Sequence, residues 1–259
     1  MSSSKKPARN TVKHKVTVAP KPGDPITTVT VSYKSLATFL KAISGCIDEA
    51  VLNILDEKLL VKTVDGGNVS MIIAECPCKA EFQKQGPRRV GINIPLLNKA
   101  LLHAKGCDVT MSISESTISL KYGRFSAKVC TVDCTQLRKE VSEPPKILHP
   151  CEISLPGKYL DEICRTVSGA GKIRIFIEDR VVMLRAEEGD LCITEVVGTA
   201  EGKQEANSLF SAALLKDISK SVKDVGCTIT AGIDHPASIA ASVNDCPLQF
   251  YLAPRIEAD

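Results

Sequence analysis

The order of helix-like and strand-like segments occurs twice along this chain of 259 residues. An apolar periodic segment that begins near Leu36 ends at Ser44-Gly45, and a matching segment that begins near Leu160 ends at Ser168-Gly169. Strand-like segments follow each of them, and a second helical segment with its own strands recurs in each half, roughly 120 residues apart. Such a duplication predicts an object with internal symmetry.

The periodicity within each half predicts an α+β fold. Apolar residues spaced three and four apart predict four short helices, at residues 34–44, 95–105, 157–168 and 212–223. β-Branched segments separated by turn residues, such as Asp65-Gly66-Gly67, predict mostly antiparallel strands. The chain is therefore expected to form two similar domains, each with two short helices on mostly antiparallel sheets.

Changes in composition divide the chain into four parts. Residues 1–25 have a net charge of +5 and four prolines, which predicts a disordered basic tail that either contacts polyanions or is merely solvated. The first domain is expected at residues 26–133 and the second at residues 151–259. Residues 134–150 are rich in proline and mixed charges, which indicates an interdomain linker.

Positive charge is concentrated in the four predicted helices. They contain nine basic and three acidic residues, a net charge of +6, whereas the chain beyond residue 25 has 27 basic and 29 acidic residues. Exposed helix positions suit lysine in any case, but they suit glutamate equally well. The imbalance favours a polyanion bound without sequence preference. Four tyrosines, six phenylalanines and no tryptophan argue against stacking on single strands, so duplex DNA is the expected ligand.

No motif of a known catalytic or cofactor site occurs. The chain lacks GxxxxGK[ST], GxGxxG after a strand, GxSxG and HExxH, so we expect no enzyme, cofactor or metal. The eleven cysteines form no CxxC pair, which favours reduced core residues in a reducing compartment over a metal site. No run of eighteen apolar residues occurs, so no membrane partner is expected.

The C-terminal residues read PLQFYLAPRIEAD, which closely resembles the end of the proliferating cell nuclear antigen (PCNA) family of DNA sliding clamps. The segments LKAISGCIDEAVLNI and GKYLDEICRTVSGAG resemble the first and third helices of that family, and the similarity runs in order over residues 26–259. The resemblance implies the DNA clamp fold and a closed ring of three subunits around duplex DNA. It implies a processivity factor that tethers DNA polymerase, ligase and nuclease, together with a clamp loader, through short peptide motifs.

The resemblance also assigns candidate residues to three surfaces. The expected DNA-binding residues on the helices are Lys41, Lys99, His103, Arg165, Lys216, Lys220 and Lys223, while Leu102 stands where relatives often have lysine. The expected partner-peptide groove comprises Val64, Asp65, Val69, Leu137, Val141, Pro236, Tyr251, Ala253 and Pro254. The expected subunit interface pairs residues 124–132 with residues 190–197 and includes Phe125, Lys128, Leu191 and Ile193.

Two other functions remain open from the sequence. One is a subunit of a heterotrimeric or DNA-damage checkpoint clamp. The other is a metal-dependent DNA enzyme that uses turn carboxylates such as Asp56 and Glu57. A sliding clamp is expected in the nucleus if the chain is eukaryotic or viral, and in the cytoplasm if it is archaeal.

Overall fold

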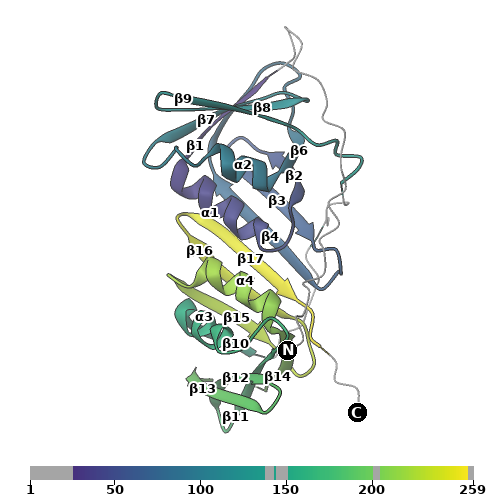
Figure 1. Cartoon of the computed structure of the whole chain (residues 1–259), viewed down its shortest axis with the longest axis vertical. Coiled ribbons are helices and arrows are strands. Elements are labelled where there is room, and N and C mark those ends of the chain that lie inside the picture. Colours follow the sequence, from purple (N-terminus) through teal and green to yellow (C-terminus); the bar gives the residue numbers. More distant parts are fainter. Residues whose placement is uncertain (1–25, 138–142, 144–150, 201–204, 256–259) are drawn as a thin grey trace, which may run out of the picture.

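Residues 26–137, 143, 151–200 and 205–255 are described by a computed structural model of the protein. The basic tail predicted at residues 1–25, Val141 and most of the predicted linker lie outside these residues. The described chain has short helices on one side of antiparallel sheets, as the α+β prediction requires (Figure 1).

Three sheets contain the strands, and all their strand pairs are antiparallel. The five-stranded sheet has the order β5 (Lys79–Phe82), β1 (Thr27–Ser32), β7 (Asp108–Ile113), β8 (Thr117–Tyr122) and β9 (Phe125–Cys130). The eight-stranded sheet has the order β10 (Cys151–Pro156), β15 (Gly226–Ala231), β16 (Ala237–Val243), β17 (Cys246–Leu252), β4 (Ser70–Pro77), β3 (Lys58–Val64), β2 (Glu49–Ile54) and β6 (Arg89–Asn93). The four-stranded sheet has the order β13 (Leu191–Thr199), β12 (Val181–Glu188), β11 (Lys172–Glu178) and β14 (Asn207–Ser211).

Each half of the described chain contributes two helices: α1 (Tyr33–Ser44), α2 (Ile94–Ala100), α3 (Gly157–Arg165) and α4 (Ala212–Val222). The Ser32 hydroxyl accepts a hydrogen bond from the Ser35 amide at 3.1 Å and so caps α1. The Asn93 side chain caps α2 through the Leu96 amide at 3.0 Å, and Pro95 occupies the first turn, where its missing amide hydrogen is not needed. Among the described residues, no helix has the length and apolar character to span a membrane.

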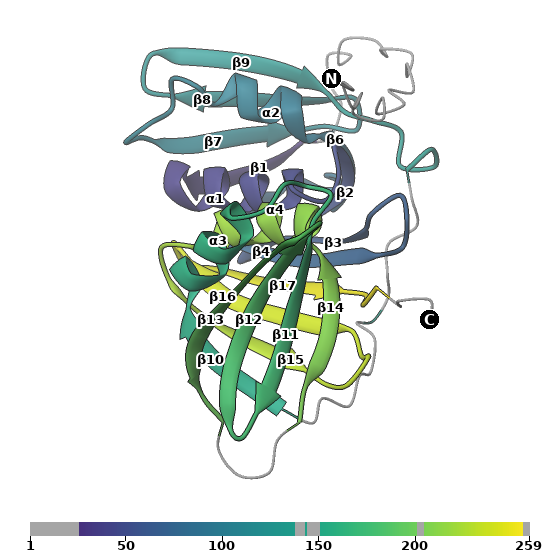
Figure 2. The same cartoon turned by 60° about the horizontal axis from the view of Figure 1, so that its bottom comes forward.

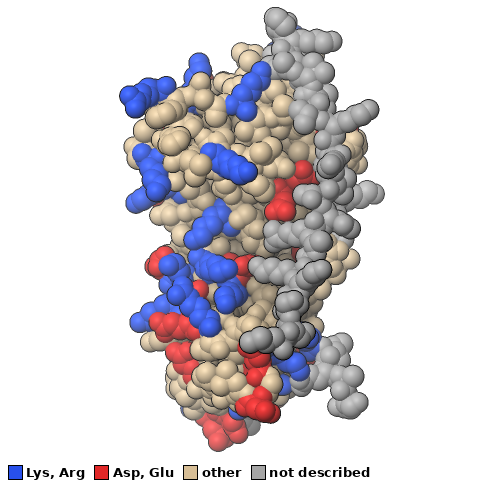
Figure 3. All heavy atoms as spheres, in the orientation of Figure 1, with Lys and Arg blue, Asp and Glu red and all other residues tan. Residues whose placement is uncertain are grey.

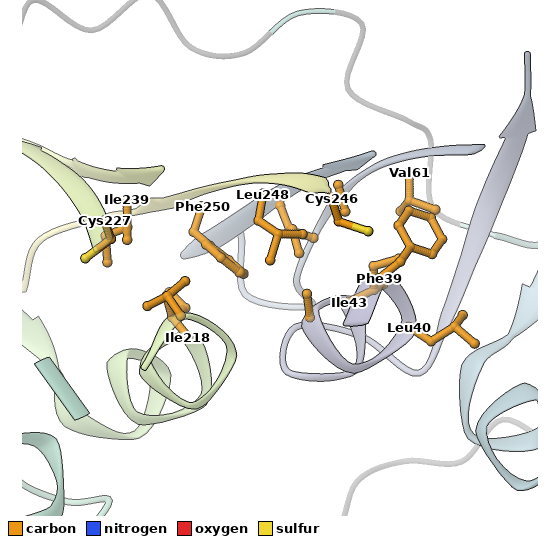
Figure 4. Packing of buried hydrophobic residues seen from close by; sticks show 14 of the residues in the cluster. Phe39, Leu40, Ile43, Val61, Ile218, Cys227, Ile239, Cys246, Leu248 and Phe250 are labelled. Atoms are coloured by element: carbon orange, nitrogen blue, oxygen red, sulfur yellow. The ribbon is translucent and has the colours of Figure 1, made fainter. Parts of the chain in front are cut away.

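The eight-stranded sheet crosses the boundary between the two halves. Strand β17 pairs with β4, so that Phe250 lies opposite Ile72 and Leu248 opposite Ala74. Phe39 and Ile43 of α1 pack beneath this sheet, as does Ile218 of α4 (Figure 4). Because the two halves share a sheet and a core, the domain boundaries expected from the sequence stay a prediction.

The elements differ from the sequence prediction mainly at their ends. Helix α2 ends at Ala100, and the predicted residues up to 105 form turns in which Leu101 still fills the core. Helix α3 ends at Arg165 rather than at residue 168. Strand β5 was not expected. Its residues alternate between exposed and partly buried positions and pair only with β1, but four residues are at the short limit of the alternation that indicates a strand.

Candidate nucleic-acid interface and partner groove

The four helices form a continuous row in the spatial order α2, α1, α4, α3, because each is in contact with the next (Figures 1 and 2). In the view that shows these helices, lysine and arginine side chains gather over them, and many of the acidic side chains lie towards one end (Figure 3). The row therefore presents a basic face that extends across both halves of the chain.

A lysine side chain links α1 and α4, the two central helices of the row. The Lys41 ammonium of α1 donates a hydrogen bond to the backbone carbonyl of Lys220 on α4 at 3.2 Å. Lys220 in turn forms an ion pair with Asp217 at 2.9 Å, and it remains about half exposed. The two candidate lysines thus lie next to each other at the meeting point of the two halves, with charge available to solvent.

Arg165 is held at the end of α3 by a buried acid. Its guanidinium lies 2.6 Å from the Asp161 carboxylate, whose side chain is only 7% exposed, whereas the Arg165 side chain is 61% exposed. Ser219 of α4 donates a second hydrogen bond to Asp161 at 3.3 Å. A buried carboxylate with two partners fixes the direction of the arginine and leaves its outer edge accessible.

The remaining candidates differ in their surroundings. Lys99 is exposed on α2, Lys216 is half-buried on α4, and Lys223 lies 3.9 Å from Asp224. The His103 ring stacks on Phe125 with centroids 5.2 Å apart, so this residue is associated with the edge strand β9 more than with the helix face. Three further exposed lysines contribute to the charge of the predicted helices, although the resemblance did not select them as DNA-binding residues: Lys34, Lys105 and Lys158.

Most residues of the predicted groove lie at or near the β3–β4 turn and the segment that follows β17. The Asp65 carboxylate accepts a hydrogen bond from the Val69 amide at 2.8 Å and shapes the β3–β4 turn. The Val69 carbonyl accepts from the Ala253 amide at 2.8 Å, so the segment after β17 lies along this turn. Pro254 follows and is partly exposed, and Pro236 precedes β16, the strand that pairs with β17.

Tyr251 and Leu137 occupy opposite sides of this surface. Tyr251 lies opposite Met71 and is 9% exposed, so it is mainly a core residue. Leu137 lies close to Gly91 of β6, four strands from β17, a separation of about 19 Å at the usual strand spacing. Val64 ends β3 between them, and Val141 lies outside the described residues. The structure therefore arranges the described candidates as a broad surface rather than a small pocket.

Two edge strands occupy opposite ends of the molecule's longest axis (Figure 1). Strand β9 pairs only with β8 and has a large exposed aromatic side chain, Phe125, at 41% exposure. Strand β13 pairs only with β12 and has exposed apolar side chains at Leu191, Ile193 and Val196. Long edge strands with apolar side chains are typical of surfaces that pair with another chain.

The charges beside the two edges have opposite sign. Arg124 and Lys128 are exposed beside β9, and Arg124 lies over the Phe125 ring at 5.4 Å. Beside β13, the pKa of the Glu195 carboxyl is raised, first by burial and then by the neighbouring Glu162 carboxylate of α3. Burial and the neighbouring carboxylate both disfavour the charged form of Glu195.

Asp56 and Glu57, the carboxylates considered for a metal-dependent DNA enzyme, lie on an exposed turn. Asp56 lies 3.6 Å from Arg88, and both Asp56 and Glu57 are exposed in the turn between β2 and β3. Within the described part of the chain, no group of three or more histidine, cysteine or acidic side chains is arranged to hold a metal ion.

The chain is similar to known DNA polymerase sliding clamps. No protein-family model matches the chain. The chain is 28% identical over 246 residues to the DNA polymerase sliding clamp of Methanothrix thermoacetophila, an alignment that covers 88% of this chain and 98% of the relative. It is 28% identical to the DNA polymerase sliding clamp of Archaeoglobus fulgidus over 86% of this chain and 96% of the relative.

Solved structures agree with these relatives. The structure of Archaeoglobus fulgidus PCNA bound to the C-terminal region of FEN-1 matches with a TM-score of 0.79 and 22% identity, covering 90% of this chain and all of that one. Entamoeba histolytica PCNA matches with a TM-score of 0.76 and 19% identity over 90% of this chain and all of that one.

The fold is therefore the DNA clamp fold, and the α+β prediction is confirmed at this level. The sliding-clamp relatives align along nearly all of their own length. These relatives confirm the resemblance to DNA sliding clamps that the C-terminal motif indicated.

Proposed function

We propose that three copies of this chain close head to tail into a ring that encircles duplex DNA and tethers replication and repair proteins to it. The observation that supports this proposal most directly is the pair of complementary edges. A single chain has β9 at one end and β13 at the other, and joining unlike ends of identical subunits generates a ring when the rotation closes.

The chemistry of the two edges favours copies of the same chain over paralogues. Phe125 would meet the apolar surface of Leu191 and Ile193, and the cations beside β9 would meet the acids beside β13. Pairing the two strands would satisfy backbone groups that each edge leaves open. This complementarity supports a homotrimer rather than a heterotrimeric checkpoint clamp.

The helix row would line the inside of the ring. Twelve short helices, four from each copy, would then surround the duplex with lysine and arginine side chains. Contacts of this kind neutralise phosphates and read no bases, so the ring could slide along any sequence. The function is mechanical tethering, and no catalytic step is assigned to the chain. Archaeal relatives favour the cytoplasmic alternative for its location.

Retention of the protein on DNA whose two ends are blocked tests whether it encircles the duplex. A linear duplex is fixed to a bead at one end, the protein is threaded over the free end, and that end is then blocked with a bulky protein. A ring is expected to stay on the doubly blocked DNA in high salt and to leave when the duplex is cut. Equal retention on blocked and open DNA would show that binding is not topological.

We also propose that the surface formed by the β3–β4 turn and the segment after β17 receives partner peptides. The Archaeoglobus relative was solved with the C-terminal region of FEN-1, which supports a peptide-binding role in this family. The exposed wall at Val69 and the partly exposed Ala253 and Pro254 offer apolar contacts, and Leu137 borders the far side.

A charge placed on this surface tests the peptide site. Val69 is 36% exposed, so Val69→Asp is expected to preserve folding and to weaken binding of a FEN-1 C-terminal peptide by about 10-fold or more, because a carboxylate would be desolvated. Leu55→Asp, at a residue 39% exposed in the β2–β3 turn, is the matched control and should bind as the unaltered protein does. Equal affinity of both variants would contradict the assignment.

A further inference from the structure

Two arginines lie directly opposite each other on the solvent face of the four-stranded sheet. Arg174 of β11 is the register partner of Arg185 on β12, and both are partly buried. Helices α3 and α4 contact this sheet on its other face, where Ile173 and Leu184 are fully buried (Figure 2). Like charges opposite each other across a strand pair are destabilising, so the pair is a cost to the fold unless something offsets it.

Both guanidinium groups are held in place by neighbouring side chains. Arg174 lies 3.4 Å from the Glu187 carboxylate and donates a hydrogen bond to the Asn207 side chain at 3.0 Å. Arg185 donates from Nε to the Thr194 hydroxyl at 3.1 Å, and its guanidinium carbon lies 4.5 Å from the centre of the Phe176 ring. Phe176 is only 8% exposed although it belongs to the solvent face, and the Arg185 guanidinium lies over its ring.

Among the described residues, a direct ion pair is formed by one arginine of the pair and not by the other. Glu187 compensates Arg174, whereas the contacts of Arg185 within the described chain are a hydroxyl and an aromatic ring, neither of them an anion. The terminal nitrogens of an arginine that is fixed through Nε can still bind an oxyanion in bidentate geometry. A cavity of about 500 Å³ opens here, and its lining includes both arginines, Phe176 and Asn207 as well as Glu178 and Glu187.

We propose that this arginine pair binds a carboxylate side chain of an acidic segment in a partner protein. The partner chemistry follows from the charges that line the cavity. Glu178 and Glu187 would repel a continuous polyanion such as a nucleic acid backbone more strongly than the single carboxylate that we propose. The site lies on the face of the sheet opposite α3 and α4, so a partner bound there would not compete with DNA on the helix row.

Methyl NMR of the full chain tests this site, because Met183 lies two residues before Arg185 on the same face of β12. The protein is labelled at its methionine methyl groups, and the Met183 signal is assigned with Met183→Leu. The probes are acetyl-Ala-Glu-Ala-amide, the same peptide with glutamine in place of glutamate, and inorganic phosphate. Only the glutamate peptide is expected to shift the Met183 signal in a saturable manner.

The variants separate the arginine pair from general surface charge. Arg185→Gln should weaken binding about 10-fold or more, and Arg185→Lys should also weaken it, because a lysine keeps the charge but loses the bidentate geometry. Lys172→Gln, on the same face of β11, removes the same charge and should change the affinity less than twofold.

Three results would overturn the proposal. These are equal binding of the glutamate and glutamine peptides, equal binding by Arg185→Gln and Lys172→Gln, and saturation by phosphate without saturation by the glutamate peptide. The last result would define a phosphate site instead. None of these readouts depends on ring formation, so this inference can fail while the proposed clamp function stands.

Discussion

Close backbone contacts depend on single glycines in this fold. A Cβ atom on Gly157, the first residue of α3, would lie 2.1 Å from the carbonyl oxygen of Val222 at the end of α4. A Cβ atom on Gly91 would lie 2.2 Å from the carbonyl oxygen of Val132, just after the last strand of the five-stranded sheet. The first contact sets the spacing of α3 and α4, and the second sets the start of the segment that contains Leu137.

Replacement of Gly157 by alanine is therefore expected to destabilise the protein. The added methyl group meets backbone rather than a flexible side chain, so we expect Gly157→Ala to lower the free energy of unfolding by about 1–3 kcal/mol. Gly66→Ala is the control, since nothing lies within 4 Å of its Cβ position, and it should change stability by less than about 1 kcal/mol. Denaturant unfolding measures both, and equal midpoints would show that α3 can move away from α4 at little cost.

The chemistry of individual residues was only partly predictable from the sequence. The sequence identified Lys41 and Arg165 as cations of the predicted helices, and the structure places them in the last turns of α1 and α3. It did not indicate that His103 stacks on Phe125, or that Asp161 is buried beneath Arg165. These arrangements depend on contacts between separate elements, for which a local pattern contains no signal.

At the scale of elements, the helices were predictable and the sheet order was not. Apolar periodicity identified the helices, because a helix makes its hydrogen bonds locally. The pairing of β17 with β4 joins residues far apart in the chain, and nothing in either strand alone specifies the other. The repeat predicted two similar halves but not that they would share an eight-stranded sheet.

The helix row makes a prediction about salt dependence. Lys41→Ala is expected to weaken duplex binding equally for all sequences and to reduce the slope of log affinity against log salt concentration, by about 0.9 for each phosphate that is no longer neutralised. Lys79→Ala is the matched control, because Lys79 is exposed on β5 and forms an ion pair with Glu81 at 3.3 Å away from the helices. Titrations at several salt concentrations measure the slopes. An unchanged slope for Lys41→Ala would remove this lysine from the DNA interface.

At the scale of the whole molecule, the described chain is an elongated unit with unlike ends. β9 has an exposed aromatic ring and nearby cations, and β13 has exposed aliphatic side chains and nearby acids. The helix row runs between these ends across both halves. Joining unlike ends would place the basic faces of all copies on the same side, which is the arrangement that a duplex inside a ring requires.

The mass of the pure protein in solution is the decisive measurement for the proposed ring. Light scattering at micromolar concentration should give about 83 kDa, three times the chain mass of 27.8 kDa. Phe125→Glu and Ile193→Glu, one on each edge, should each reduce the mass towards that of one chain, whereas Leu55→Glu should leave the trimer intact. A mass of 27.8 kDa for the unaltered protein would contradict the proposed ring.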